Sequence, residues 1–133
     1  MKYLKSLLLV IVAIMLLNAD GCNDTVTYKI INELDKNVKI IGFATWANPI
    51  LESAPIYIKP NGTYEIERDV FGAGDHTYFS IENIDSVRVI FPEDGKVNIA
   101  TSHGNEGVFS DNPHYIRLDD FLSAQDCESD DDC

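Results

Sequence analysis

The chain has 133 residues with 22 acidic and 10 basic side chains, which gives a formal net charge of −12 at pH 7. This charge disfavours nucleic acids and anionic lipid surfaces as partners, because contacts to phosphate require clustered lysine and arginine. Two of the basic residues fall in the first 21 positions and the others are scattered. No nucleic acid is therefore expected as a partner.

The N-terminus has the parts of an export signal. Lys2 and Lys5 make a positive head, residues 7–17 form an unbroken apolar run, and small residues follow it. A helix needs about 20 residues to cross the hydrocarbon core, so this shorter run suits a cleavable signal better than a permanent span. We predict a signal peptide over residues 1–21.

The end of this signal contains a candidate lipidation site. Ala19-Asp20-Gly21-Cys22 resembles the lipobox of bacterial lipoproteins, in which a small residue precedes the cysteine that receives diacylglycerol. A usual lipobox has leucine and an uncharged small residue at the places of Ala19 and Asp20. Ordinary signal cleavage stays open as an alternative, because Ala19 and Gly21 satisfy the small-x-small rule. We predict lipid on Cys22, with residues 22–26 as a lipidated cysteine and short tether.

Period-two alternation of apolar residues dominates the rest of the chain and is typical of half-buried β-strands. The first two expected strands cover residues 25–30 and 38–46, and residues 35–37 break the pattern between them. A turn of this length favours a hairpin, so these two strands should pair antiparallel. Residues 47–55 contain two prolines and should form a loop.

A second hairpin is expected around Pro60-Asn61-Gly62, between strands at residues 56–58 and 63–70. Proline presets such a turn and Asn-Gly supplies the positive φ that tight turns require, so this is the strongest hairpin signal in the chain. The solvent face of the strand over residues 63–70 is acidic. The remaining expected strands cover residues 77–81, 86–91, 97–100 and 114–118.

The strand over residues 86–91 is expected to be central, and Asp94-Gly95 should turn it into the next strand. Residues 119–124 can begin one helical turn. Seven or eight short strands with turns about every ten residues predict an all-β fold, an antiparallel β-sandwich of immunoglobulin-like or similar type, or a partly open barrel. One such domain should cover residues 27–122.

Residues 123–133 form an acidic C-terminal tail with two cysteines. In an oxidising compartment Cys127 and Cys133 can close a small disulfide loop, and lipid on Cys22 then accounts for the third thiol. The carboxylates of the tail lack the alternating register that wraps a loop around calcium, so no metal is expected there.

Three stretches in order along the chain carry a family resemblance. They are Cys22-Asn23-Asp24, residues 58–63, and residues 85–96 followed by His114-Tyr115. Together they resemble a group of small Bacteroidetes lipoproteins that have no assigned function. The resemblance implies a lipid-anchored protein of the bacterial cell envelope, on the outer membrane or at the cell surface, with a β-rich domain.

The sequence shows no recognisable catalytic constellation, and no cofactor is expected. His76, His103 and His114 fall in or beside expected loops, but their spacing fits no familiar zinc motif. A nucleophile elbow is absent, and acidic residues are too abundant for any pair to stand out as catalytic carboxylates.

Trp46, the one tryptophan, stands at a strand end beside the apolar loop of residues 47–51. Large aromatics in small domains usually complete the core, so burial that closes one end of the sandwich is the expected outcome. If exposed, Trp46 would form a contact patch with Tyr57 for a protein or a sugar.

These patterns predict a lipid-anchored envelope protein that acts as a non-catalytic binding or structural β-sandwich module, with another envelope protein or a glycan as its partner. A carbohydrate-binding module is one alternative, and it would need a flat row of exposed aromatics including Trp46 and Tyr57. A hydrolase is another, and it would need a pocket that unites His76, His103 or His114 with buried carboxylates.

Overall fold

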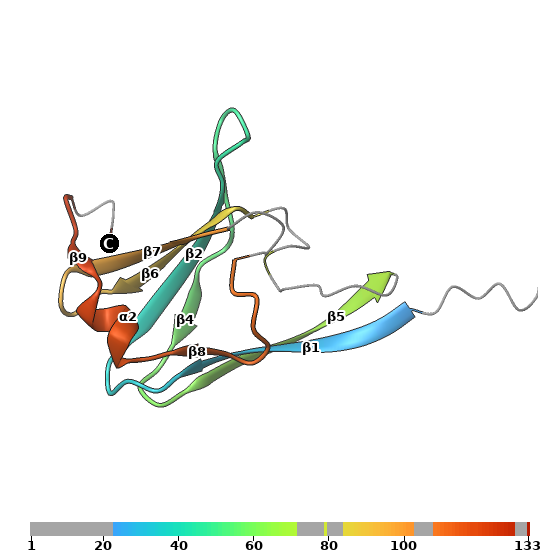
Figure 1. Cartoon of the computed structure of the whole chain (residues 1–133), viewed down its shortest axis with the longest axis horizontal. Helices are drawn as coiled ribbons and strands as arrows, with labels where there is room; N and C mark the ends of the chain where they lie inside the picture. Colours follow the sequence, from blue (N-terminus) through green and yellow to red (C-terminus); the bar gives the residue numbers. More distant parts are fainter. Residues whose placement is uncertain (1–22, 72–78, 80–83, 103–107, 130–132) are drawn as a thin grey trace, which may run out of the picture.

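The structure is a computed structural model that describes residues 23–71, 79, 84–102, 108–129 and 133. It is mostly β-structure, and its two packed sheets form an all-β sandwich, which confirms the predicted fold class (Figure 1). Within these residues no helix is both long and apolar enough to cross a membrane. Residues 1–21 and Cys22 lie outside the described residues.

The smaller sheet contains three strands in the order β5-β1-β8. β1 runs antiparallel to β5 along its length and parallel to β8 only over its last three residues. The first part of β1 therefore pairs with β5 alone, and the two strands extend beyond the rest of the sandwich as a ribbon (Figure 1). The bounds are β1 Asn23–Asn32, β5 Thr63–Phe71 and β8 His114–Ile116.

The larger sheet contains six strands in the order β3-β2-β6-β7-β9, and β4 pairs with β2 beside β3. β6 lies between β2 and β7, which confirms its predicted central place. The β6–β7 hairpin also forms as predicted, with Gly95 at a φ of 61° in its turn. The bounds are β2 Val38–Ala44, β3 Leu51–Glu52, β4 Ile56–Ile58, β6 Ser86–Phe91, β7 Lys96–Thr101 and β9 Gln125–Asp126.

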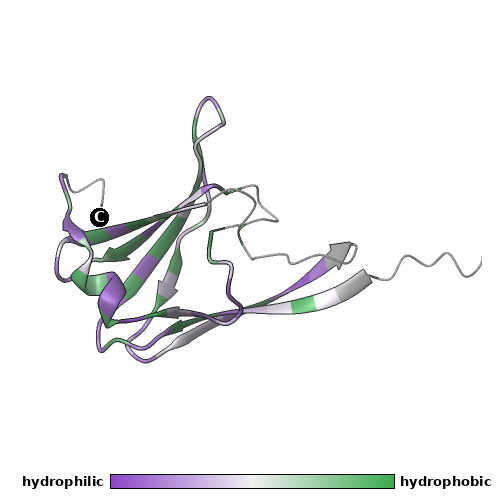
Figure 2. Cartoon of the chain, in the orientation of Figure 1, coloured by the Kyte–Doolittle hydropathy of each residue, from purple (hydrophilic) through white to green (hydrophobic). Residues whose placement is uncertain are grey.

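The core lies between the two sheets, where the alternating side chains of β2, β4 and β6 face β1 and β8. Apolar residues concentrate along the strands of the larger sheet, while the outer part of β5 is polar (Figure 2). The backbone of Gly42 packs tightly against core side chains. A Cβ added at this residue would lie 2.9 Å from Cγ2 of Ile84 and 3.0 Å from Cε1 of Phe79. A side chain there would overpack the core.

The predicted hairpin between the first two strands is wrong. β1 and β2 belong to different sheets, and residues 33–37 carry the chain from one layer to the other. The corner is organised by Asn32, which is fully buried. Its Nδ2 donates to the carbonyl oxygens of Lys36 at 2.7 Å and Lys59 at 3.0 Å, and its Oδ1 accepts from the Leu34 N–H at 3.1 Å.

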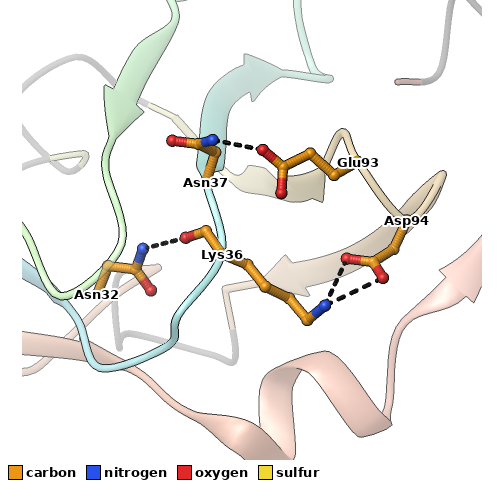
Figure 3. A network of polar contacts seen from close by, with 5 residues as sticks. All are labelled: Asn32, Lys36, Asn37, Glu93 and Asp94. Carbon is orange, nitrogen blue, oxygen red and sulfur yellow. Dashed lines mark hydrogen bonds and ion pairs between the residues drawn. The ribbon is translucent and has the colours of Figure 1, made fainter.

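Side chains of this corner also bind the β6–β7 turn in the other sheet (Figure 3). Nζ of Lys36 lies 3.0 Å from Oδ2 of Asp94, and the amide of Asn37 donates to Glu93. The connection after β1 is therefore tied to the β6–β7 turn of the larger sheet.

The second predicted hairpin is wrong in the same way. The turn itself forms, with Asn61 at a φ of 54° and the Gly62 N–H donating to the Lys59 carbonyl at 3.0 Å. However, β4 before it pairs with β2, and β5 after it pairs with β1. The turn passes from one layer to the other, and its backbone also bonds to the corner, where the Asn61 N–H donates to the Leu34 carbonyl at 2.9 Å.

Three further expectations can be compared with the structure. The expected strand over residues 77–81 falls outside the described residues except for Phe79, which is fully buried and not in a strand. The expected helical turn forms as α2 Leu118–Leu122. Part of the expected tail is ordered, because β9 pairs with β7.

Candidate functional site

Three exposed apolar residues lie at the end of the β2–β3 hairpin. Trp46, Ile50 and Leu51 are 68%, 57% and 56% exposed, and we call these three residues the apolar tip. The hairpin projects from the sandwich at the top of Figure 1. The expected burial of Trp46 is wrong, because the side chain follows the last residue of β2, where no opposite layer covers it.

The base of this hairpin is fastened by hydrogen bonds. The N–H and the hydroxyl of Thr45 both donate to the Asp85 carboxylate at distances of 2.9–3.2 Å. On the other strand, Ser53 Oγ accepts from the Gly42 N–H at 2.9 Å. Partial burial raises the pKa of Asp85, but the hydrogen bonds from Thr45 outweigh it and hold that pKa below its ordinary value. The tip therefore projects from an anchored base.

Tyr57 is also exposed, at 69%, but the structure does not bring it to Trp46. It lies opposite Lys39 near the start of β2, whereas Trp46 follows the end of that strand. At about 3.3 Å per residue, the stretch of β2 from Lys39 to Ala44 alone spans roughly 16 Å. The expected patch of Trp46 with Tyr57 does not form, and aliphatic residues of the loop stand beside the tryptophan instead.

The outer face of the larger sheet is a feature that the sequence reasoning missed. Strand alternation points Phe43 and Ile90 away from the core, and neither belongs to the main core cluster, yet they are 9% and 1% exposed. The Arg88 guanidinium lies 4.8 Å from the centre of the Phe43 ring. Lys39 of β2 lies opposite Ile90 of β6, and its Nζ donates to the Cys133 carbonyl oxygen at 2.8 Å.

The C-terminal end of the chain thus reaches this outer face. Cys127 and Cys133 are joined by a disulfide, with their Cα atoms 6.1 Å apart, which is the pairing that the spacing allowed. The Cys127 N–H donates to the Gly95 carbonyl at 2.9 Å, directly after β9 pairs with β7. The disulfide loop is therefore held at both of its ends against the larger sheet.

A cavity of about 210 Å³ opens between the two layers, beside β7 and β8, and we call it the β7–β8 cavity. His114 forms part of its wall, and the imidazole stacks on Phe109 with the ring centres 3.6 Å apart. Phe109 in turn meets the buried Phe79 edge to face at 5.5 Å. The cavity is lined by Val89, Asn98, Ala100, Thr101, Val108, Phe109, Ser110, Asp111, His114 and Asp120.

The loop that carries this wall is tied to the smaller sheet. Asn112 continues the edge of β1 with its side chain, since Oδ1 accepts from the Lys29 N–H at 3.0 Å and Nδ2 donates to the Thr27 carbonyl at 2.8 Å. Phe109 has a φ of 58°, a left-handed conformation that is unusual for a bulky residue. The loop between Phe109 and His114 is therefore attached to the edge of β1 through the side chain of Asn112.

The electrostatics of the cavity are set by acids and one imidazole. Burial lowers the pKa of His114, and the positive charge of Arg117 acts in the same direction, against the opposing effect of the Asp120 and Asp111 carboxylates. Asp120 is engaged at the start of α2, where Oδ2 accepts from the Arg117 N–H at 2.7 Å. Asp111 is exposed and Asp120 half-buried, so neither is the buried carboxylate that the hydrolase alternative requires.

The other two histidines of that alternative, His76 and His103, lie outside the described residues. Among the residues that the structure does describe, no three His, Cys, Asp or Glu side chains are grouped to hold a metal ion. Nothing in the sequence revealed that Phe109 and His114 would stack, because their contact depends on how the loop packs against β1.

No known protein family, characterised protein or solved structure matches the chain. Its function must therefore be inferred from its own residues and geometry. The resemblance to small Bacteroidetes lipoproteins stays a prediction.

Proposed function

We propose that the chain is a lipid-anchored, non-catalytic binding module of the bacterial cell envelope, which attaches to another envelope protein through the apolar tip. One observation supports this most directly. Trp46 is 68% exposed, beside two aliphatic side chains, at the end of a projecting hairpin. Exposed apolar groups gathered at one projecting point are typical of protein contact sites.

The chemistry of the tip suits a protein partner. Tryptophan is enriched among the few interface residues that dominate binding energy, and such residues lie at the centre of the contact in well-packed pockets. Thr45 next to it is fastened to Asp85 by backbone and side-chain hydrogen bonds. An anchored base reduces the ordering cost of binding, so more of the contact energy appears as affinity.

A glycan is a poorer fit to the same geometry. The carbohydrate-binding alternative requires Trp46 and Tyr57 in one flat aromatic row, and the register of β2 and β4 separates them. The neighbours of Trp46 at the tip are Ile50 and Leu51, which offer no hydrogen bonds to hydroxyl groups. An apolar groove on a protein is the complementary surface.

The lipid anchor is supported by the export signal and by the position of Cys22. β1 begins at Asn23, directly after this cysteine. Lipid on Cys22 would therefore sit at the end of the β1–β5 ribbon and hold the sandwich, with its tip, at the membrane surface. The resemblance noted above favours the outer membrane or the cell surface.

Site-specific crosslinking in the native envelope tests the protein contact. Trp46 is replaced by the photoreactive benzoylphenylalanine, and Leu122, which is 69% exposed on α2, receives the same replacement as a matched control. We expect one discrete adduct with an envelope protein from position 46 and none from position 122. The substitution Trp46→Ala should lower co-isolation of that protein at least about tenfold, since a central interface tryptophan contributes about 2 kcal/mol or more.

Two outcomes would contradict the proposal. Equal adducts from both positions would mean that the tip has no special role. Retention of the chain on an envelope polysaccharide, lost in Trp46→Ala and without any protein adduct, would replace the protein partner with a glycan.

A further inference from the structure

The β7–β8 cavity lies between the layers and is separate from the apolar tip in its residues and in its chemistry. Its floor is apolar and formed by Val89, Ala100 and Val108, while its rim contains carboxylates, hydroxyls and an amide. Among the described residues that line it there is no lysine or arginine. A concave site with an apolar floor and a few convergent polar groups is the usual form of a small-molecule site.

We propose that this cavity binds a small alkylammonium ion. An ammonium group has three hydrogen-bond donors and no acceptor. The rim offers it the Asp111 and Asp120 carboxylates and the ring of His114. The alkyl chain would lie on the apolar floor, where its removal from water is favourable.

The charge of the rim selects a cation over an anion or a neutral ligand. Burial lowers the pKa of His114, so the imidazole is neutral at pH 7 and can accept a hydrogen bond from the ligand. The Arg117 guanidinium is paired with Glu33, with Nε 3.0 Å from Oε2. Asp111 and Asp120 are the acidic residues among the described lining residues, and no lysine or arginine is among those described.

The volume limits the size of the ligand. An apolar cavity of about 150 Å³ holds benzene, so about 210 Å³ has room for roughly six to eight non-hydrogen atoms. A chain of five or six carbons with one ammonium matches this. Larger molecules would have to leave part of themselves in solvent.

The wall is organised before any ligand arrives. Phe109 is held at a φ of 58°, and Asn112 is bound to the backbone of β1 on the far side of the loop. Preorganised groups lose little freedom on binding, which favours a ligand this small. The proposal does not depend on the partner of the apolar tip.

Titration of the full chain by NMR tests the proposal, with n-pentylammonium chloride as the probe and 1-pentanol as a neutral probe of the same size. We expect saturable shifts for residues 98–101 and 108–114 with pentylammonium, at a dissociation constant of about 1 mM or lower. Pentanol should give none. Saturable binding of pentanol with equal affinity would overturn the proposal, and so would unchanged spectra with both probes.

Nα-acetyl-lysine methylamide is a third probe, because a lysine side chain of a peptide carries the same chemical group. Tighter binding of this compound than of pentylammonium would identify a lysine side chain as the natural ligand. Weaker binding would identify a free small amine. Either result supports an alkylammonium site.

Three variants separate charge, shape and bulk electrostatics. Asp111→Asn removes one carboxylate of the rim and should weaken pentylammonium binding about fivefold, as expected for a partly exposed ion pair. Ala100→Leu fills the floor and should abolish binding. Glu67→Gln, on the exposed face of β5, makes the same charge change as Asp111→Asn and should leave the affinity unchanged.

The spectra of each variant in the absence of probe verify that it is folded. If Glu67→Gln weakened binding as much as Asp111→Asn, the attraction would come from the net charge of the protein and the proposal would fail. Undiminished binding to a folded Ala100→Leu would place the probe outside the cavity and would overturn the proposal as well.

Discussion

Asn32 is a fully buried polar side chain, and its surroundings explain why it is tolerated there. Burying an amide costs free energy unless its donors and acceptor are satisfied. Here both Nδ2 hydrogens and Oδ1 find backbone partners in two different connections of the chain. This one side chain therefore satisfies backbone groups of residues 34, 36 and 59, which have no place in a strand ladder because the chain crosses between the sheets there.

Truncation of this side chain should destabilise the whole domain. Asn32→Ala leaves the Leu34 N–H and the carbonyls of Lys36 and Lys59 without this partner in a buried place, so we expect a loss of about 3 kcal/mol in the free energy of unfolding. Urea denaturation followed by circular dichroism measures it. Asn48→Ala, at an exposed position, is the control and should change stability by less than about 0.5 kcal/mol. Equal midpoints for the two variants would contradict the role of Asn32.

The Asp85 carboxylate makes the stability of the fold depend on pH in the acidic range. Its pKa in the folded state lies below the ordinary value of 3.8, so folding favours the charged carboxylate. The stability that it contributes is fully present above about pH 4 and is lost as the pH falls through the folded pKa.

Asp85→Asn should therefore be less stable than the unchanged chain at pH 6, and this difference should shrink at pH 3. Denaturation curves at the two pH values measure the effect, and an NMR titration of the Asp85 carboxyl group should give a midpoint below 3.8. A midpoint above that value would contradict the hydrogen bonding from Thr45.

Two turns with suitable local sequences, at Asn61 and at Gly95, differ in whether they join strands of one hairpin. The turn at Asp94-Gly95 joins two strands that pair with each other in the same sheet, so it forms a hairpin. The turn at Asn61 has equally suitable residues, but the strands on its two sides are buried in different sheets. A turn sequence selects a backbone conformation, and burial selects the partner of each strand.

The attachment of the short strand β9 depends on residues outside the strand. β9 contains only two residues and pairs with β7 at Lys96 and Val97. A strand this short gains little from its own ladder bonds, so its attachment depends on the residues that follow it. Those residues are the disulfide loop, which is bound at Gly95 and at Lys39.

Opening the disulfide should therefore loosen β9 without unfolding the sandwich. Cys133→Ser should increase amide hydrogen exchange at Val97 and Gln125, because the loop that holds β9 in place is no longer closed. Exchange in the β1–β5 ladder should not change. Hydrogen exchange followed by NMR measures both regions in one sample. Unchanged protection of β9 would mean that the disulfide does not hold it.

At the scale of the whole molecule, charge and apolar surface are separated. The exposed side of the β1–β5 ribbon carries Glu65, Glu67 and Asp69, and β5 appears as a polar strand in Figure 2. The apolar tip is formed by a different hairpin, from the larger sheet. An acidic surface repels anionic surfaces, so charge alone would not attach this domain to an anionic membrane.

The lipid anchor can be tested through Cys22. The intact mass of the chain isolated from its own membranes should include diacylglycerol on Cys22 at a new N-terminus. Cys22→Ser should lack the added mass of diacylglycerol, because no thiol remains to receive it. An unmodified mature N-terminus in the membrane-bound protein would contradict the lipid.

Much of this architecture follows from patterns that are local in the chain. Alternation predicted β2, β4, β5, β6 and β7 to within a few residues at each end, because the side-chain period of a strand is a property of the backbone. The Asp94-Gly95 hairpin and the helical turn after Ile116 are local in the same sense. The expectation of a two-layer β-sandwich rests on these signals together.

Other features were decided only when the layers packed. The partners of β1, the exposure of Trp46 and the stacking of Phe109 on His114 each depend on residues far away in sequence. Alternation states that one face of a strand is buried, but not which layer covers it or where that cover ends. Trp46 lies just past that end, and the β7–β8 cavity lies where two sheets and a loop meet without filling the space between them.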